Sequence, residues 1–230
     1  MTSGQRIGEI DLFRGLAILL MVIFHTVVDL QDFFHIDLDY RSGIWYFVGR
    51  SSAILFMLLA GISSQFSRSN LRRGLQVLAA GLLVTGATYC FLPDAYVRFG
   101  ILQLLGCSML LQPLAARLSV FAQLLLALLV LVAGPSVAVL NTDTSLLLPL
   151  GLMPPGFRSI DYYPLLPWYG VFLLGAAGGR LIYANRRSRL PFSLSENPLN
   201  WLGRHSLTIY LLHQPLLLVM LNIFFILLPF

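Results

Sequence analysis

Long apolar runs alternate with short polar connections along the chain. Seven runs are long and apolar enough for a helix to cross the hydrocarbon core of a membrane, which takes about 20 residues. They cover residues 11–31, 44–66, 74–92, 98–116, 119–138, 164–184 and 205–228. Only residues 139–163 form a longer connection. This pattern predicts an all-α fold, a polytopic transmembrane helical bundle with about seven membrane-spanning helices.

The distribution of arginine predicts the orientation of this bundle. Positively charged residues gather on the cytoplasmic side of membrane proteins. With a cytoplasmic N-terminus, eleven arginines fall inside: Arg6, Arg14, Arg68, Arg72, Arg73, Arg117, Arg180, Arg186, Arg187, Arg189 and Arg204. Four fall outside: Arg41, Arg50, Arg98 and Arg158. An eighth span through SLLLPLGLMPP would move the RRSR cluster outside, so residues 139–163 are interpreted as a re-entrant or interfacial external loop.

Composition supports an integral membrane protein. Of the 230 residues, 57% are hydrophobic and 11% are charged, and the mean hydropathy is +0.81. The net charge of +5 is scattered between apolar runs, so it indicates membrane topology and no nucleic acid partner. Cys90 and Cys107 lie in apolar runs without the spacing of a zinc site or a disulfide framework. No internal repeat is evident, and one domain over residues 1–230 is expected.

The first apolar run carries a stripe of ionisable side chains. A helix turns by about 100° and rises by about 1.5 Å per residue, so Arg14 and His25 lie within about 20° of one face and roughly 16 Å apart along the axis. Asp11 and Asp29 lie on the same stripe, and Asp32 extends it at the outer end. Titratable groups at this depth usually face the bundle interior or a water-filled cavity.

The stripe has the chemistry that acyl transfer requires. Arg14, near the cytosolic face, is suited to bind phosphate. His25 is suited to act as a general base or to accept an acyl group, and Asp29 to fix its tautomer. The structural alternative is that Arg14 reaches to the inner interface and that His25 bonds a neighbouring helix.

Four blocks of the chain resemble a known family in the right order. They are RIGEIDLFRGLAILLMVIFHTVVDL, VRFGILQLLG (97–106), DYYPLLPWYGVFLLGAAGGRL (161–181) and LGRHSLTIYLLHQP (202–215). They resemble the heparan-alpha-glucosaminide N-acetyltransferase catalytic-domain family, especially its short bacterial members. The ten residues between Arg14 and His25 also match the Arg-x10-His motif of other transmembrane acyltransferases.

The resemblance implies a donor, an acceptor and a location. Acetyl-CoA would enter from the cytosol. A sugar-like acceptor would bind on the opposite side and receive the acetyl group on its amino or hydroxyl group. No soluble domain is present to hold a long polysaccharide, so a small cell-surface acceptor in a bacterial inner membrane fits better. No metal is expected, and a homo-oligomer is left open.

The resemblance also introduces a second candidate for the central histidine. The eukaryotic enzymes have a catalytic histidine in the first external loop, where FFHIDLDYRSG provides His35. His25 is favoured because both the stripe and the Arg-x10-His motif select it. His35 otherwise reads as a solvated interfacial histidine.

The later runs add binding candidates. Arg204, His205 and His213 are predicted to bind the donor together with Arg14, and Arg50, Arg98 and Gln103 to contact the acceptor. Each has a structural alternative: helix capping for Arg204 and His205, a polar contact for His213, interfacial placement for Arg50 and interhelical hydrogen bonding for Gln103.

Two other classes of function remain open at this point. A small-molecule or ion transporter would use the stripe as a relay, and would move its ligand without depending on CoA. A membrane scaffold would use the stripe only for helix packing.

Overall fold

The computed structural model describes residues 7–140, 142–185, 187–189 and 197–227. Arg6 and Arg186, and the end of the last predicted run at Leu228, lie outside the described residues. The chain divides into two compact units. The first combines residues 1–56 with residues 188–230, and the second covers residues 57–187.

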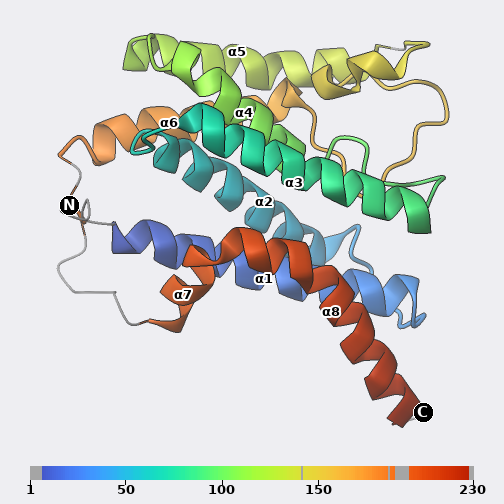
Figure 1. The fold of residues 1–230 in the computed structure, drawn as a ribbon. Coiled ribbons are helices and arrows are strands. Elements are labelled where there is room, and N and C mark those ends of the chain that lie inside the picture. Colours follow the sequence, from blue (N-terminus) through green and yellow to red (C-terminus); the bar gives the residue numbers. More distant parts are fainter. Residues whose placement is uncertain (1–6, 141, 186, 190–196, 228–230) are drawn as a thin grey trace. The chain divides into compact units, whose positions relative to one another are not determined.

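The described residues form eight α-helices and one 3-10 helix (Figure 1). These are α1 (Gly8–Asp32), α2 (Gly43–Ser64), α3 (Asn70–Phe91), α4 (Ile101–Ala115), α5 (Val120–Ala138), η1 (Ser145–Leu150), α6 (Leu165–Ile182), α7 (Pro198–Arg204) and α8 (Ser206–Leu227). Six of them, all except α4, α7 and η1, are long and apolar enough to cross a membrane. The predicted polytopic helical bundle is confirmed.

The predicted fourth span, over residues 98–116, was too long. As a helix it covers only Ile101–Ala115, which is 15 residues and about 22 Å at the rise of an α-helix. Arg98 lies in a bend outside the helix instead, and Phe99 forms an isolated β-bridge with Tyr162. Asp161 caps the helix start, because its Oδ2 accepts a hydrogen bond of 3.1 Å from the Ile101 N–H.

The long connection after α5 is folded. Its 3-10 helix η1 has six residues, far fewer than a membrane-spanning helix needs. The Tyr162 hydroxyl donates a hydrogen bond of 2.8 Å to the carbonyl of Leu148 in η1. Residues 139–163 therefore contain no eighth span within their described part.

The first unit is built on α1. The short helix α7 crosses α1 with direct backbone contact, because a Cβ at Gly15 would overlap the Leu199 carbonyl and one at Gly203 would overlap the Asp11 carbonyl. Helix α8 follows α7 and also contacts α1 (Figure 1). The buried Ser52 hydroxyl of α2 donates to the Ala17 carbonyl at 2.9 Å. Several apolar residues of α1 are thereby buried.

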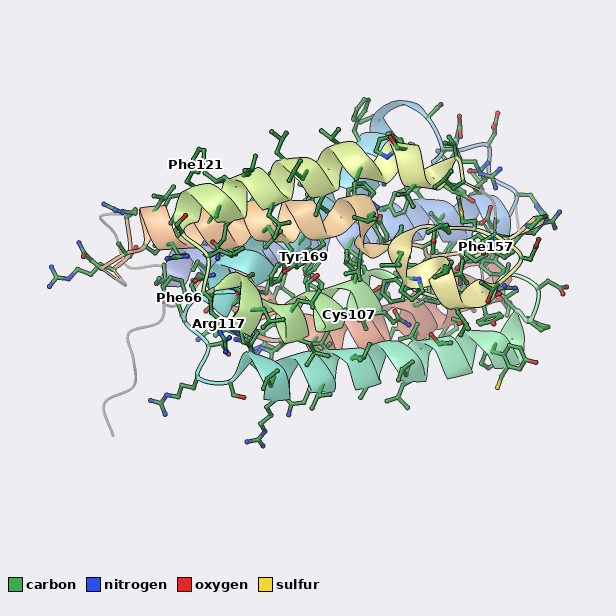
Figure 2. All side chains as sticks on the ribbon, turned by 90° about the horizontal axis from the view of Figure 1, so that it is seen from above. Phe66, Cys107, Arg117, Phe121, Phe157 and Tyr169 are labelled. Atoms are coloured by element: carbon green, nitrogen blue, oxygen red, sulfur yellow. The ribbon has the colours of Figure 1, made fainter. Side chains whose placement is uncertain are left out.

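The second unit contains two helix pairs. Helix α3 packs along α4, and α5 packs along α6 (Figure 1). Buried Ala115, Ala127 and Leu173 form a small core, and Tyr169 packs against it. Phe121 is 77% exposed and points outward from α5 (Figure 2). An outward apolar surface of this kind suits contact with lipid.

Candidate active site

The N-terminal part of α1 holds the predicted donor-binding arginine. Arg14 Nη1 and Asp11 Oδ1 form an ion pair of 3.0 Å between neighbouring turns, as the i, i+3 spacing predicts. Because Gly203 contacts the backbone of Asp11, the end of α7 lies beside this pair. Arg204 follows Gly203 and directs its Nε to the Asn200 carbonyl at 3.2 Å. The fold therefore brings Arg14 and Arg204 to the same end of α1.

Two histidines meet further along α1 and α8. The rings of His25 and His213 lie 4.8 Å apart between centroids, in an edge-to-face arrangement. His25 Nδ1 is 3.0 Å from the Met21 carbonyl, and His213 Nδ1 is 2.6 Å from the Tyr210 carbonyl. A carbonyl only accepts, so each Nδ1 carries the proton. In each neutral ring the Nε2 atom then keeps its lone pair and is the basic atom.

Asp29 makes a different contact from the one predicted. Asp29 was expected to orient the His25 ring, but that ring is held by the carbonyl of Met21. Asp29 Oδ1 instead accepts a hydrogen bond of 2.6 Å from Gln214 Nε2 on α8. Polar groups of a membrane helix commonly bond their own backbone, which explains why the nearer carbonyl holds the imidazole. The i, i+4 spacing still places His25 and Asp29 on one face, since they contact consecutive residues of α8.

Three buried atoms in this cluster share one property. Asp29 Oδ2, His213 Nε2 and Gln214 Oε1 have no hydrogen-bond partner among the described residues. With Nδ1 as the donor in His213, all three are acceptors. Burying an acceptor without a partner costs about 1–3 kcal/mol, so each such atom calls for an explanation. A ligand with several N–H or O–H donors would satisfy them.

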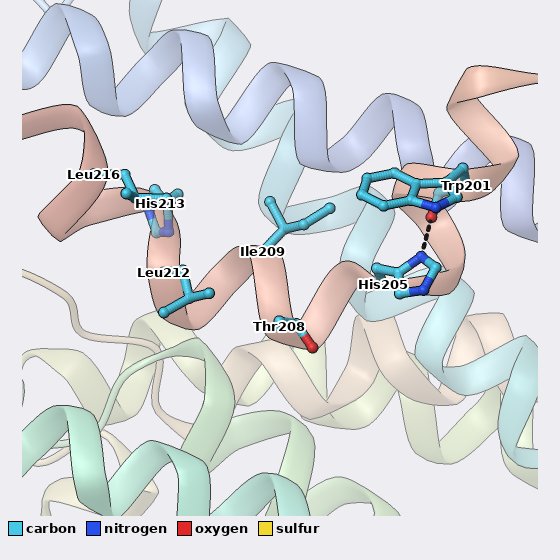
Figure 3. A pocket seen from close by; sticks show the side chains of 7 residues that line it. All are labelled: Trp201, His205, Thr208, Ile209, Leu212, His213 and Leu216. Atoms are coloured by element: carbon cyan, nitrogen blue, oxygen red, sulfur yellow. Dashed lines mark hydrogen bonds between the residues drawn. The ribbon is translucent and has the colours of Figure 1, made fainter. Parts of the chain in front are cut away.

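An open groove of about 300 Å³ runs along α7 and α8. It is lined by Trp201, His205, Thr208, Ile209, Leu212, His213 and Leu216 (Figure 3). At one end the His205 ring lies against the Trp201 ring, with Nδ1 2.9 Å from the Trp201 carbonyl. Toward the other end lies His213, and between them the lining is mainly aliphatic. The groove links the neighbourhood of Arg204 with the histidine pair.

His35 lies in the loop after α1. It has a left-handed backbone conformation, with φ of 56°, and its side chain is exposed. The loop is held at Tyr40, whose hydroxyl donates to Asp32 Oδ2 at 3.2 Å and whose ring contacts Phe24 edge to face. Phe24 in turn contacts the His25 ring. The loop after α1 is thus connected to the His25 ring through Phe24.

The three predicted acceptor-binding residues differ in their surroundings. Arg50 lies in the first unit, where its guanidinium stacks on the Tyr46 ring and donates to the Tyr46 hydroxyl at 3.1 Å. Arg98 lies in the second unit, with its guanidinium between the rings of Tyr96 and Phe157 at 4.9 and 5.4 Å. Aromatic contacts of this kind hold a guanidinium in place.

Gln103 is used entirely for packing. Its Oε1 accepts from the Gly100 N–H at 3.0 Å, and its Nε2 donates to the Gly81 carbonyl at 2.9 Å and the Thr85 hydroxyl at 2.7 Å. Both amide hydrogens are therefore occupied by α3. Gln103 therefore forms interhelical hydrogen bonds, which was its structural alternative in the sequence analysis. It is not included in the candidate site.

Two residues that the sequence argument did not select make buried polar contacts in the first unit. Gln214 contacts Asp29. The sequence signal that could have identified Gln214 is a glutamine next to a histidine within an apolar run. Glu9 is only 2% exposed and accepts hydrogen bonds from the Ser188 hydroxyl and from the Arg189 N–H, the latter at 2.7 Å. A glutamate at the start of an apolar helix is ordinary, so nothing local distinguished Glu9.

Comparison with known proteins identifies the family. The family model described as heparan-alpha-glucosaminide N-acetyltransferase, catalytic, matches residues 6–215. No curated protein and no solved structure gives a significant match. The match runs through all four of the blocks that carried the resemblance, and it includes α1, both histidines and the groove. The chain therefore belongs to this catalytic family of acetyltransferases and is a multi-pass membrane protein.

Proposed function

We propose that the protein transfers an acetyl group from cytosolic acetyl-CoA to an amino or hydroxyl group of a sugar-like acceptor on the external side of a bacterial inner membrane. The observation that carries the proposal is the contact between His25 and His213, whose Nε2 atoms are both basic, beside a groove that leads toward Arg204. The family match supports acetyl transfer, and the arginine distribution supports a cytoplasmic N-terminus.

The inner end of the first unit is suited to the nucleotide part of the donor. Arg14 and Arg204 supply guanidinium groups that bind phosphate oxygens with charge-assisted hydrogen bonds. From His205 to His213 a helix rises about 12 Å, which a slender acyl-pantetheine arm can follow. Thr208, Ile209 and Leu212 line that path, so most of its surface is apolar and suits the methyl and methylene groups of the arm. The thioester would then reach His213.

The buried acceptor atoms favour a polyhydroxylated or amino-bearing acceptor. Asp29 Oδ2 and Gln214 Oε1 need hydrogen-bond donors, and sugars present several close together. In the reaction His25 Nε2 removes the proton of the attacking amino or hydroxyl group. The Met21 carbonyl holds the ring in the tautomer that this step needs. Asp29 contacts the acceptor and accepts from Gln214.

The proposal is tested by thermal-shift titration of the purified protein in detergent with acetyl-CoA, CoA and ATP. We expect saturable stabilisation by acetyl-CoA and CoA, weaker stabilisation by ATP, and loss of the acetyl-CoA shift in Arg14→Ala. Arg117→Ala is the matched control, because it removes another arginine from the predicted inner side that is exposed and outside the candidate site.

Two results would contradict the proposal. An equal loss of the acetyl-CoA stabilisation in Arg14→Ala and Arg117→Ala would show a general effect of charge, and Arg14 would not be a binding residue. If neither acetyl-CoA nor CoA stabilises the wild-type protein, acetyl-CoA is not its donor. The transporter hypothesis would then be tested by ligand flux in liposomes.

A further inference from the structure

The donor groove reaches His213 and does not include His25. The residues that line the groove belong to α7, to α8 and, for His205, to the junction between them, and His213 lies among them (Figure 3). His25 contacts His213 from α1 and touches Phe24, which leads to the external loop at Tyr40. The two rings therefore face different neighbours: His213 faces the path of the donor, and His25 faces the side from which the acceptor would come.

Both rings are fixed in the same protonation pattern. Each donates its Nδ1–H to a carbonyl of its own helix, so each has a basic Nε2. His213 is 8% exposed, and its Nε2 has no partner among the described residues. A buried imidazole whose ring centroid lies 4.8 Å from that of a second imidazole is placed to pass a proton, once a ring rotation or one water connects the two Nε2 atoms.

We propose that His213 is a second catalytic residue, which protonates the sulfur of the departing CoA with a proton received from His25. This inference rests on the proposed function. It changes the role of His213 from the donor-binding residue of the sequence argument to a general acid. It also explains why two histidines with the same tautomer occupy one buried place.

The relay balances as follows. The acceptor nitrogen or oxygen attacks the thioester carbonyl, and the new bond to carbon forms as the carbon–sulfur bond breaks. The proton of the acceptor moves to His25 Nε2, then to His213 Nε2, and then to the CoA sulfur. Both histidines return to their starting state, and the products are the acetylated acceptor and CoA with a free thiol. No oxidant, metal or other reactant is required.

The test compares two donors that differ in their need for a proton. CoA leaves as an alkyl thiolate, which is more basic than the thiophenolate that leaves from phenyl thioacetate, so the departure of CoA gains more from protonation of its sulfur. The acceptor probe is glucosamine, and kcat/KM is measured for each donor in wild type, His25→Gln and His213→Gln. Asn222→Ala is the matched control, since it changes an exposed polar residue of the same helix outside the groove lining.

We expect His213→Gln to lose about 100-fold in kcat/KM with acetyl-CoA, in the range of general acid catalysis, and to stay close to wild type with phenyl thioacetate. His25→Gln is expected to lose activity with both donors. Retained thermal stabilisation by CoA shows that a variant is folded and binds the donor. His213→Asn repeats the comparison if the glutamine variant does not fold.

Three outcomes would overturn the relay. Equal losses with the two donors in His213→Gln would make His213 a structural or binding residue. Full activity of His213→Gln with acetyl-CoA would show that no general acid is lost. A wild-type protein that acetylates glucosamine from neither donor would overturn the proposed function, and the relay with it; that result differs from the other two because it appears before any substitution is made.

Discussion

Gln214 donates a hydrogen bond of 2.6 Å to the buried carboxylate of Asp29, across 185 positions of the chain. The bond joins α8 to α1, and on α8 it lies one residue after His213, which contacts His25. It therefore fixes the register in which His213 meets His25. A helix pair in a membrane has little hydrophobic driving force, so polar contacts of this kind help to set its geometry.

The Asp29–Gln214 pair should show strong energetic coupling. We expect Asp29→Leu and Gln214→Leu each to lower the free energy of unfolding, and the double variant to lower it by less than the sum. The difference should be about 1.5–3 kcal/mol, the range for a hydrogen bond to a charged group. Reversible unfolding in detergent measures it. Asn222→Leu, on the same helix, combined with Asp29→Leu should be additive, and additivity of the main pair would contradict the structure.

The ion pair at the inner end should compete with the donor. Asp11 occupies one edge of the Arg14 guanidinium, so Asp11→Asn is expected to tighten acetyl-CoA binding about fivefold, which corresponds to about 1 kcal/mol for an accessible ion pair. Arg14→Ala is expected to weaken binding. Isothermal titration calorimetry measures both. If the two variants change the affinity in the same direction, the pair serves structure and Arg14 does not bind phosphate.

Gln103 should matter for stability and not for chemistry. Gln103→Leu leaves the buried Gly100 N–H and the Gly81 carbonyl without their partner, so the free energy of unfolding should fall by roughly 3 kcal/mol. The kcat of the folded fraction should stay at the wild-type value. Gln76→Leu, at an exposed amide of α3, is the control and should change neither. A loss of kcat in Gln103→Leu without a loss of stability would show that Gln103 belongs to the active site.

Asp161 should make stability depend on pH. Burial raises the pKa of its carboxyl to about 6 from an ordinary value of 3.8, while the hydrogen bond from Ile101 opposes the shift. The folded protein then binds the proton more tightly than the unfolded chain. Its stabilising contribution is complete below about pH 4 and is lost as pH rises through 6, by at most about 3 kcal/mol.

Thermal unfolding of wild type and Asp161→Asn over that pH range isolates this contribution. The difference between the two proteins should change between pH 4 and pH 7 and be flat above. A difference that is constant over the whole range would contradict the shifted pKa of Asp161.

The membrane-spanning helices could be predicted because their signal is local. A run of about 20 apolar residues is enough to indicate a span, and six of the seven runs match long helices within a few residues at each end. The fourth was overestimated because Arg98 and Phe99 read as part of an apolar run. Their backbone instead contacts Ser159 and Tyr162, about 60 positions away, which no local pattern reveals.

The candidate site could likewise be predicted only where its contacts lie within one helix. The spacing within α1 predicted the shared face of His25 and Asp29 and the Asp11–Arg14 pair, because one helix determines both. The partners on α8 could not be predicted, since they depend on how α1 and α8 pack. The expected Asp29–His25 bond was wrong: His25 Nδ1 bonds the Met21 carbonyl, and Asp29 Oδ1 bonds Gln214 of α8.

The most direct test of the account is acceptor-dependent release of CoA thiol by the reconstituted protein. With acetyl-CoA and a panel of amino sugars and neutral sugars, wild type should release CoA in step with acetylated sugar. His25→Gln should lose about 100-fold or more in kcat while it still binds acetyl-CoA, and His35→Gln should keep most of the activity. Loss of turnover in His35→Gln with full activity in His25→Gln would contradict the central role of His25.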